Sequence, residues 1–264
     1  MQGDILGYIR SNSKPECHLR MTSPITLSAQ NLTRRHNKHV AVEGLSLELH
    51  RGEVLGLLGH NGAGKSTTLQ MLAGALPPDS GTVVICDFDM AQQPELAKSC
   101  IGFLPEHPPL YMDMQVNDYL LFAARLHLVP SEKLAEALEL AKQRCGLQEN
   151  GRKIIGTLSK GFQQRVGIAQ AIIHNPAVVV LDEPTVGLDP AQIRDIRALI
   201  RDLGDNSSVI LSTHLLNEVE SLCDRVIILQ KGRLIYSGSS TEMLVNGNME
   251  DAFLQITENE AASS

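Results

Sequence analysis

Long apolar runs are absent from this sequence of 264 residues. The longest, such as Ala177 to Leu181, have the length of a strand, whereas a helix that crosses a bilayer needs about 20 apolar residues. The sequence therefore argues against a membrane-spanning helix. The amino-terminal segment also lacks the apolar centre of a signal peptide. We expect residues 1–22 to form a flexible tail. Met21 is a candidate for the functional start, which would place residues 1–20 upstream of it.

An excess of basic residues is also absent. The chain has 23 Lys and Arg against 30 Asp and Glu, which gives a formal net charge of −7 at pH 7. A surface that holds nucleic acid or anionic lipid needs clustered Lys and Arg. The charge therefore argues against a nucleic-acid partner, and any membrane attachment is expected to run through a protein partner.

Metal-ligand patterns built from cysteine and histidine are lacking as well. The five cysteines are scattered, with no close pair at the spacing of a zinc site. His36, His39 and His50 lie closer together, but their irregular spacing gives a metal site little support.

The sequence does contain an alternation of short strands and helices. Apolar alternation predicts strands at Ile25–Asn31 and Gly44–Leu49, and a strand–helix rhythm resumes after Lys160. Further strands are predicted at residues 53–58, 82–86, 177–181, 209–212, 225–230 and 233–236, and helices at 66–73, 191–203 and 215–222. This alternation predicts an α/β fold with a mostly parallel sheet, flanking helices and an antiparallel β subdomain.

A helical segment interrupts this pattern. Between about Gln115 and Cys145 apolar residues recur at helical spacing, which predicts a helical subdomain, about residues 107–158, inserted into the α/β core. We therefore expect one domain over residues 23–245, followed by a carboxyl-terminal helix or tail at 246–264.

A phosphate-binding loop is the first motif that carries chemistry. It reads Gly59-His60-Asn61-Gly62-Ala63-Gly64-Lys65-Ser66, fits G-x-x-x-x-G-K-[ST], and lies between a predicted strand and a predicted helix. The glycines let backbone N–H groups wrap around phosphates, Lys65 brings a charge to the β- and γ-phosphates, and Ser66 completes the coordination of Mg²⁺. We assign this P-loop and the adjacent Thr67 to ATP. The alternative, a glycine-rich connector, would leave the strand before it and the helix after it unexplained.

Two acids end the apolar strand at residues 177–181. They are Asp182 and Glu183, at the carboxyl edge where open α/β sheets bind ligands. In P-loop enzymes the first acid holds Mg²⁺, often through water, and the second is suited to orient and deprotonate the attacking water. A strand that ends in Asp-Glu is weak evidence alone, but the upstream P-loop makes it strong.

Between these motifs lies Leu158-Ser159-Lys160-Gly161-Phe162-Gln163-Gln164-Arg165, which resembles the signature of ABC ATPases. The usual form is LSGGQ, so Lys160 and Phe162 depart from it, whereas Ser159 and Gly161 are retained. The resemblance implies a P-loop NTPase fold in which this element contacts the ATP of a second ATPase subunit. Activity would then require a head-to-tail dimer, most simply a homodimer, that encloses two ATP.

Further segments resemble the same family. Gly187-Leu188-Asp189-Pro190 is similar to the loop that communicates across the dimer, with Asp189 as its acid. Ser212-Thr213-His214 is similar to the switch segment, which implies that His214 contacts the γ-phosphate. A histidine after a strand is more often a capping or core residue, so this interpretation rests on the order of the motifs.

Two positions resemble the family less closely. His36 stands where an aromatic residue generally stacks on adenine, and a plain surface histidine is the rival interpretation. Glu106 stands where the family often has Gln, whose side chain reaches Mg²⁺ and the attacking water. A carboxylate can still contact the metal.

The run Leu104–Tyr111 resembles ATPases of ABC-2-type exporters, including those of gliding motility and of copper or nitrous-oxide reductase maturation. This implies an ATP hydrolase, cytoplasmic and peripheral on the inner face of the membrane, that drives a separate permease. Two alternatives are a soluble ABC ATPase acting on ribosomes or DNA and the ATPase of an importer. The former usually has two nucleotide modules or coiled-coil arms, and the latter often has a regulatory domain beyond the core. The sequence does not encode the transported substrate.

Overall fold

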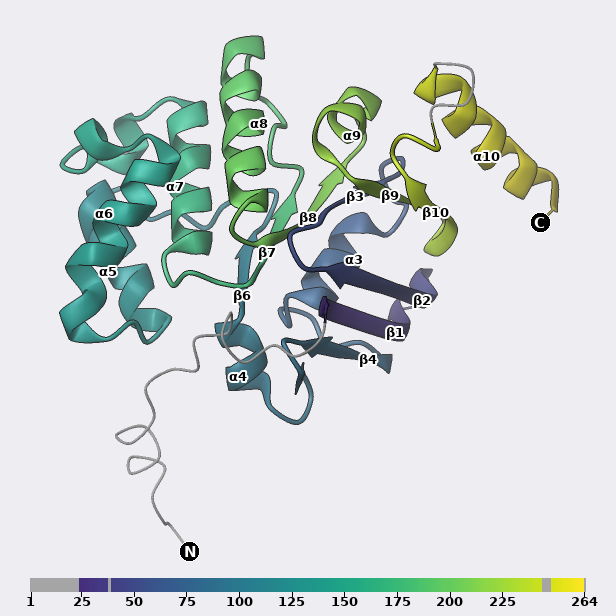
Figure 1. The fold of residues 1–264 in the computed structure, drawn as a ribbon, viewed down its shortest axis with the longest axis horizontal. Coiled ribbons are helices and arrows are strands. Elements are labelled where there is room, and N and C mark those ends of the chain that lie inside the picture. The colour runs from purple at the N-terminus through teal and green to yellow at the C-terminus, as the bar shows by residue number, and fades with distance from the viewer. Residues whose placement is uncertain (1–23, 38, 244–247, 264) are drawn as a thin grey trace, which may run out of the picture.

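The computed structural model describes residues 24–37, 39–243 and 248–263. The predicted tail at 1–22 lies outside the described residues, as do positions 246 and 247. Figure 1 shows strands at the centre, a group of helices at one end and a single helix at the other. No helix within the described ranges is both long and apolar enough to cross a membrane.

Two sheets form the core. The larger has six strands in the order β10-β9-β3-β8-β7-β6, parallel except for β10. The smaller is antiparallel, in the order β2-β1-β4-β5. The larger sheet is built from β3 (Val54–Leu58), β6 (Ile101–Leu104), β7 (Val178–Asp182), β8 (Ser208–Thr213), β9 (Arg225–Gln230) and β10 (Arg233–Ser239), and the smaller from β1 (Ile25–His36), β2 (His39–His50), β4 (Ser80–Ile85) and β5 (Phe88–Asp89).

The central strands are buried along their whole length. Every residue of β3, β7 and β8 is buried, which agrees with the apolar runs of β3 and β7 and with the apolar centre of β8. The smaller sheet instead alternates buried and exposed residues along β2. The predicted α/β fold with an antiparallel subdomain is therefore confirmed.

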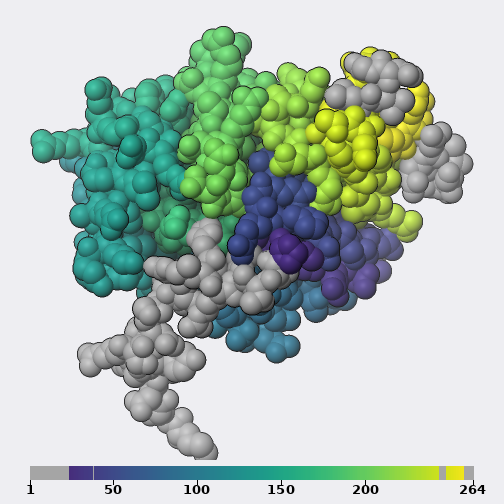
Figure 2. Space-filling view, in the orientation of Figure 1, coloured from purple at the N-terminus to yellow at the C-terminus, as the bar shows by residue number. Residues whose placement is uncertain are grey.

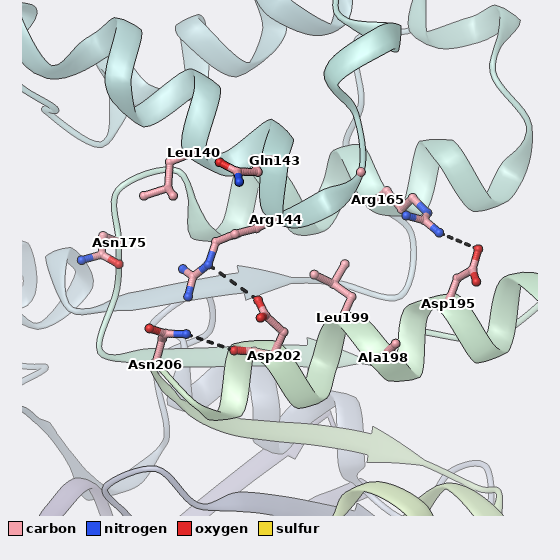
Figure 3. Close-up of a pocket in the computed structure, with 11 residues that line it drawn as sticks. Leu140, Gln143, Arg144, Arg165, Asn175, Asp195, Ala198, Leu199, Asp202 and Asn206 are labelled. Atoms are coloured by element: carbon pink, nitrogen blue, oxygen red, sulfur yellow. Dashed lines mark hydrogen bonds and ion pairs between the residues drawn. The ribbon is translucent and has the colours of Figure 1, made fainter.

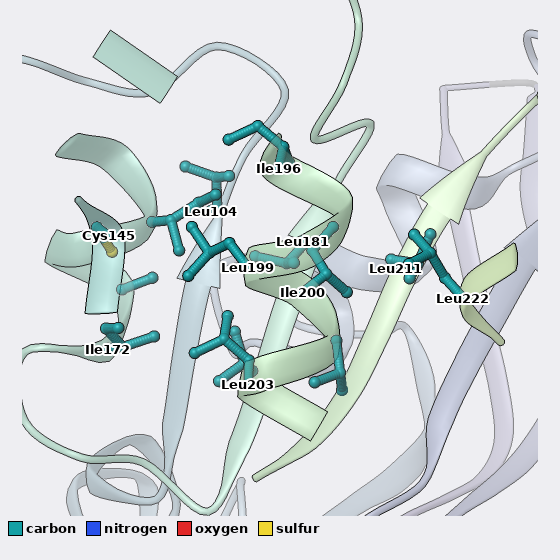
Figure 4. Packing of buried hydrophobic residues seen from close by; sticks show 14 of the residues in the cluster. Leu104, Cys145, Ile172, Leu181, Ile196, Leu199, Ile200, Leu203, Leu211 and Leu222 are labelled. Carbon is teal, nitrogen blue, oxygen red and sulfur yellow. The ribbon is translucent and has the colours of Figure 1, made fainter. Parts of the chain in front are cut away.

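Helices cover both faces of the larger sheet. On one face α3 (Lys65–Leu72) packs with Leu69 and Leu72 against Leu57 of β3 and Val180 of β7. The opposite face is covered by α7 (Lys160–Ile172), α8 (Pro190–Gly204) and α9 (Leu216–Leu222), which pack against alternate residues of the same strands. Figure 4 shows α8 directing a stripe of four apolar side chains toward β7 and β8: Ile196, Leu199, Ile200 and Leu203. The P-loop helix and the signature helix thus lie on opposite faces of the sheet.

The helical subdomain consists of α5 (Val116–Leu126) and α6 (Leu134–Cys145), which pack against α7, together with short 3₁₀ turns. It forms one end of the molecule, drawn in teal in Figure 2. A short helix, α4 (Pro94–Ser99), precedes β6. At the other end α10 (Met249–Ser263) buries Phe253, whose ring meets the ring of His60 edge-on with centroids 5.4 Å apart.

A cavity of about 750 Å³, lined by both polar and apolar side chains, opens between α6, α7 and α8 (Figure 3), and no P-loop residue lines it. Two ion pairs cross it, Arg165–Asp195 at 2.7 Å and Arg144–Asp202 at 3.8 Å. Both aspartates are largely exposed, and exposed pairs contribute only about 0–1 kcal/mol each. On this side Arg144–Asp202 joins the helical subdomain to α8, whereas Arg165–Asp195 joins α7 to α8.

Candidate active site

The carboxyl ends of four neighbouring strands meet at one edge of the larger sheet. Because β3, β8, β7 and β6 are parallel and adjacent, the residues that follow them are brought together. These are the P-loop after β3, His214 after β8, Asp182 and Glu183 at the end of β7, and Glu106 after β6.

The glycines of the P-loop are required by its packing. Gly64 has φ +103°, and a Cβ there would lie 2.5 Å from the carbonyl oxygen of Ala41 on β2. A Cβ on Gly59 would lie equally close, 2.5 Å, to the carbonyl oxygen of Leu229 on β9. The loop is therefore fixed against both sheets before it opens into α3, whose first turn carries no acidic residue. This leaves the helix N-terminus suited to an anion.

Lys65 and Ser66 begin α3 and reach toward the end of β7. The buried Lys65 ammonium donates to the carbonyl oxygen of Gly59 at 2.8 Å and lies 3.3 Å from Glu183 Oε1. The Ser66 hydroxyl donates to Asp182 Oδ1 at 3.2 Å. A hydroxyl and a carboxylate that converge in this way are ligands of the type Mg²⁺ takes alongside phosphate and water, so the residues present fit this ion.

Asp182 lies in a buried and negatively charged environment. Burial raises the pKa of its carboxyl, and the neighbouring charges of Glu106 and Glu183 raise it further. Hydrogen bonds from Ser212 Oγ, at 2.6 Å, and from Ser66 act in the opposite direction. A cation at this position would relieve the charge repulsion.

Glu183 connects the P-loop to the switch segment. Its Oε2 lies 2.9 Å from Nδ1 of His214, whose side chain is 42% exposed. Its backbone N–H donates to Ser212 Oγ at 2.9 Å, and its φ is +47°, in the left-handed region. Such backbone conformations in residues other than glycine persist where the surroundings hold them, and they are common at functional sites.

The exposed positions of the P-loop are His60, Asn61 and Gly62, while Ala63 is buried and Thr67 is partly buried. Glu106 is exposed after β6, near enough for its charge to act on Asp182.

His36 is also exposed, at the end of β1 opposite His39. The strand that starts at His39 continues to Ala41, which lies against Gly64, so this β-hairpin borders the P-loop.

The signature residues do not join this cluster. Ser159 precedes α7, and its hydroxyl makes no capping bond to that helix. A Cβ on Gly161 would lie 2.7 Å from Gln192 Cδ in the first turn of α8. Asp189 caps α8 by accepting from the backbone N–H groups of Ala191 and Gln192, both at 2.9 Å. The beginnings of α7 and α8 therefore pack together, whereas α3 lies on the other face of the sheet.

Ser212 has a structural role that the sequence did not reveal. Its hydroxyl binds both Asp182 and the backbone of Glu183, because Asp182 and Ser212 face each other in the β7–β8 register. A serine at the end of an apolar strand is an ordinary feature, and only the strand pairing identifies its partners.

Comparison with known proteins agrees with this geometry. The sequence profile of the family described as ABC transporter matches residues 42–186. The linearmycin resistance ATP-binding protein LnrL of Bacillus subtilis is 36% identical over 222 residues, which cover 82% of this chain and 70% of that protein. The bacitracin transport ATP-binding protein BcrA of Bacillus licheniformis is 35% identical over 212 residues, 79% of this chain and 68% of that one.

Solved structures share the fold. One is the ATP-binding subunit of an ABC transporter, with a TM-score of 0.77 and 26% identity over 88% of this chain and 99% of that one. Another is cbiO1 from Clostridium perfringens, part of the complex cbiONQ, with a TM-score of 0.76 and 26% identity over 91% and 99% of the two chains.

Proposed function

Since this chain belongs to the family of ABC transporter ATP-binding subunits, which hydrolyse ATP to drive transport, we propose that Lys65, Glu183 and His214 form its catalytic centre. The observation that carries this proposal is the position of Glu183, whose two carboxylate oxygens lie 3.3 Å from Lys65 Nζ and 2.9 Å from His214 Nδ1. One carboxylate thus joins the residue that binds phosphate to the residue of the switch segment.

The roles follow from the contacts. P-loop N–H groups and the Lys65 ammonium bind the β- and γ-phosphates, and phosphate oxygens compete with Glu183 for that ammonium. Released from Lys65, the Glu183 carboxylate can accept a proton from the attacking water. The His214 ring holds the carboxylate in place and, at 42% exposure, can still contact the γ-phosphate.

Ser66 and Asp182 are the residues that would hold Mg²⁺, with Glu106 as a further candidate beside them. When bound, this ion neutralises charge that develops on the phosphates. His36, on the β-hairpin that borders the P-loop, is the candidate for stacking on adenine.

The active form is a head-to-tail homodimer that encloses two ATP. Support comes from the placement of α3 and α7 on opposite faces of the sheet, which separates Ser159 and Gly161 from the P-loop of their own chain. In a symmetric pair the signature helix of each subunit can face the P-loop of the other.

The partner is a membrane permease, and the chain lies on the cytoplasmic face of the membrane through that contact alone. ABC ATP-binding subunits work with permease components. LnrL is named for linearmycin resistance and BcrA for bacitracin transport, and both names support an exporter of the ABC-2 type. The negative net charge supports neither nucleic acid nor bare lipid as a partner.

The proposal is tested by comparing Glu183→Gln with Lys65→Ala. Glutamine keeps the shape of Glu183 but cannot take a proton, so ATP should still bind while kcat falls by about 100-fold or more. Lys65→Ala removes the phosphate contact and should weaken ATP binding itself. Nucleotide binding and steady-state hydrolysis, measured on both purified variants, separate the two effects. A wild-type rate for Glu183→Gln would show that the assigned base is wrong.

A further inference from the structure

A buried carboxylate lies behind the active site and takes no part in the chemistry described above. It belongs to Glu218 on α9, and this residue is only 1% exposed. Glutamate is almost never fully buried unless it is paired, because removing a charge from water has a large cost in free energy. The partners of Glu218 therefore indicate what holds it there.

Three side chains from three other elements meet this carboxylate. The Thr185 hydroxyl donates to Oε1, and the Thr213 hydroxyl donates to Oε2 at 2.6 Å. Arg197 of α8 places Nη2 3.7 Å from Oε1. Oε1 thus contacts the turn after β7 and α8, and Oε2 contacts the end of β8.

The two threonines are neighbours of the proposed catalytic residues. Thr185 stands two positions after Glu183 in the turn beyond β7, and Thr213 directly precedes His214 at the end of β8. Arg197 lies on the helix that Asp189 caps. Glu218 therefore joins the loops that carry Glu183 and His214, without an observed bond to either side chain.

The loops need such a connection for two reasons. Glu183 has a left-handed backbone, which the surrounding contacts must hold in place. His214 is 42% exposed, so packing alone does not fix its ring. Bonds at Thr185 and Thr213 anchor the chain two residues after Glu183 and directly before His214.

We propose that Glu218 is a positioning residue for ATP hydrolysis, which sets the Glu183–His214 contact by binding Thr185 and Thr213 at the same time. Arg197 extends this connection to α8, the helix that begins at the predicted dimer loop. The inference rests on the proposed roles of Glu183 and His214. A purely structural Glu218 would instead affect stability and leave kcat of the folded protein unchanged.

The first test exchanges the carboxylate. Glu218→Gln keeps the shape but loses one acceptor and the charge that faces Arg197. We expect kcat to fall about 10- to 100-fold, the loss that follows when a reacting group is misplaced. KM for ATP should stay within about twofold, because the P-loop is untouched. The matched control is Glu220→Gln, the same change at an exposed position of the same helix, which should keep the wild-type kcat.

The second test keeps the carboxylate and alters its partners. Thr185→Val and Thr213→Val preserve shape but remove the donated hydrogen bond, whereas Thr185→Ser and Thr213→Ser keep the hydroxyl. We expect both valine variants to lose kcat and both serine variants to retain most of it. These variants decide the matter even if Glu218→Gln fails to fold. Wild-type kcat in folded valine variants would overturn the proposal.

A double variant separates this proposal from the proposed function. If Glu218 acts only through Glu183 and His214, adding Glu218→Gln to Glu183→Gln should lower kcat no further. Losses that multiply would contradict positioning. If Glu183→Gln alone hydrolyses ATP at the wild-type rate, the catalytic assignment is wrong. If Glu183→Gln loses activity but Glu218→Gln keeps the wild-type kcat, only the role of Glu218 is overturned.

Discussion

Three carboxylates, those of Asp182, Glu183 and Glu106, lie near one another where β6 and β7 end. Burial and the two neighbouring charges raise the pKa of Asp182. The folded chain therefore keeps this proton to a higher pH than the unfolded chain does. As the pH rises from the unfolded pKa through the folded pKa, ionisation of Asp182 lowers the free energy of unfolding.

Asp182→Asn should therefore stabilise the protein while it destroys the metal site. Asparagine keeps an oxygen for the Ser212 and Ser66 hydroxyls but carries no charge. At pH 7, without Mg²⁺ or ATP, we expect a higher Tm, by roughly 2–4 °C for each kcal/mol gained in a domain of this size. The difference should shrink as the pH falls toward about 3.9, the ordinary pKa of aspartic acid.

Thermal melting with and without Mg²⁺ and ATP checks both the higher stability of Asp182→Asn and the loss of its metal site. Mg²⁺ with ATP should raise the Tm of the wild type more than that of the variant, which keeps the P-loop but lacks the metal-site carboxylate, because tighter binding gives greater stabilisation. A variant that melts below the wild type at pH 7 would contradict the interpretation of Asp182 as a destabilising buried charge.

At the scale of elements, the segment that leads from β6 into the helical subdomain has two sides. Pro108 packs against Gly167 of α7, where a Cβ would lie 3.1 Å from its side chain. Leu110 and Met114 pack against the core, whereas Tyr111 and Met112 are 54% and 46% exposed. Burial therefore assigns Leu110 and Met114 to packing inside the protein and leaves Tyr111 and Met112 on its surface.

The exposed pair is the candidate docking surface for the permease. The Tyr111 ring lies 6.0 Å from that of the buried Tyr119 and 5.7 Å from that of the exposed Phe122, both on α5, so Tyr111 and Phe122 form an aromatic patch that can receive a short helix. Fixed backbone angles at Pro108 and Pro109 stiffen the segment that connects this patch to Glu106, and Pro105 stiffens the chain just before Glu106.

Tyr111→Asp or Met112→Asp should separate basal activity from coupling. Neither side chain is buried, so folding and basal ATP hydrolysis should stay within about twofold of the wild type, as surface changes usually allow. Association with the permease in detergent, and its stimulation of hydrolysis, should be lost. Leu140→Asp, an equally exposed position on α6, is the control and should leave association intact. Equal loss of folding and basal activity in the Tyr111 variant would show that the ring packs rather than docks.

At the scale of the molecule, the proposed dimer implies that one chain carries two incomplete halves of a site. The P-loop opens into α3 on one face of the sheet, and Ser159 and Gly161 begin α7 on the other. A head-to-tail pair would contain two composite sites related by its two-fold axis.

Mixing two inactive variants tests this arrangement. Gly161→Asp places a carboxylate where phosphate is expected, and Lys65→Ala disables the P-loop, so each alone should hydrolyse little ATP. An equal mixture should recover about a quarter of the wild-type rate, since half of the symmetric pairs are mixed and each has one intact site. Gly161→Ala, which meets the same flexible Gln192 without adding charge, controls for crowding.

Two results would contradict the composite site. The first is full activity from a preparation shown to be monomeric. The second is a mixture no more active than its components although mixed dimers have formed.

The sequence by itself determined the family, the fold class and the chemistry. P-loop, acidic strand end, signature and switch histidine are local patterns, and each predicts a function from residue types at fixed spacing. The predicted α/β fold, ATP hydrolysis and transport role are confirmed for this reason. The position of the P-loop, the acidic pair and the switch histidine after predicted strands also indicates that they lie close together, because parallel strands bring their carboxyl ends to one edge of the sheet.

The tertiary structure decided which residues hold these motifs in place. The short strand β6, which carries Glu106 to the site, has only four residues and went unpredicted. The sequence also did not identify Ser212 and Glu218 as hydrogen-bond partners of the active-site loops, since a serine at a strand end and a glutamate on a short helix are common. Their partners lie 30 and 33 residues away, at Asp182 and Thr185. Contacts over such separations depend on strand register and helix packing, which local residue patterns do not specify.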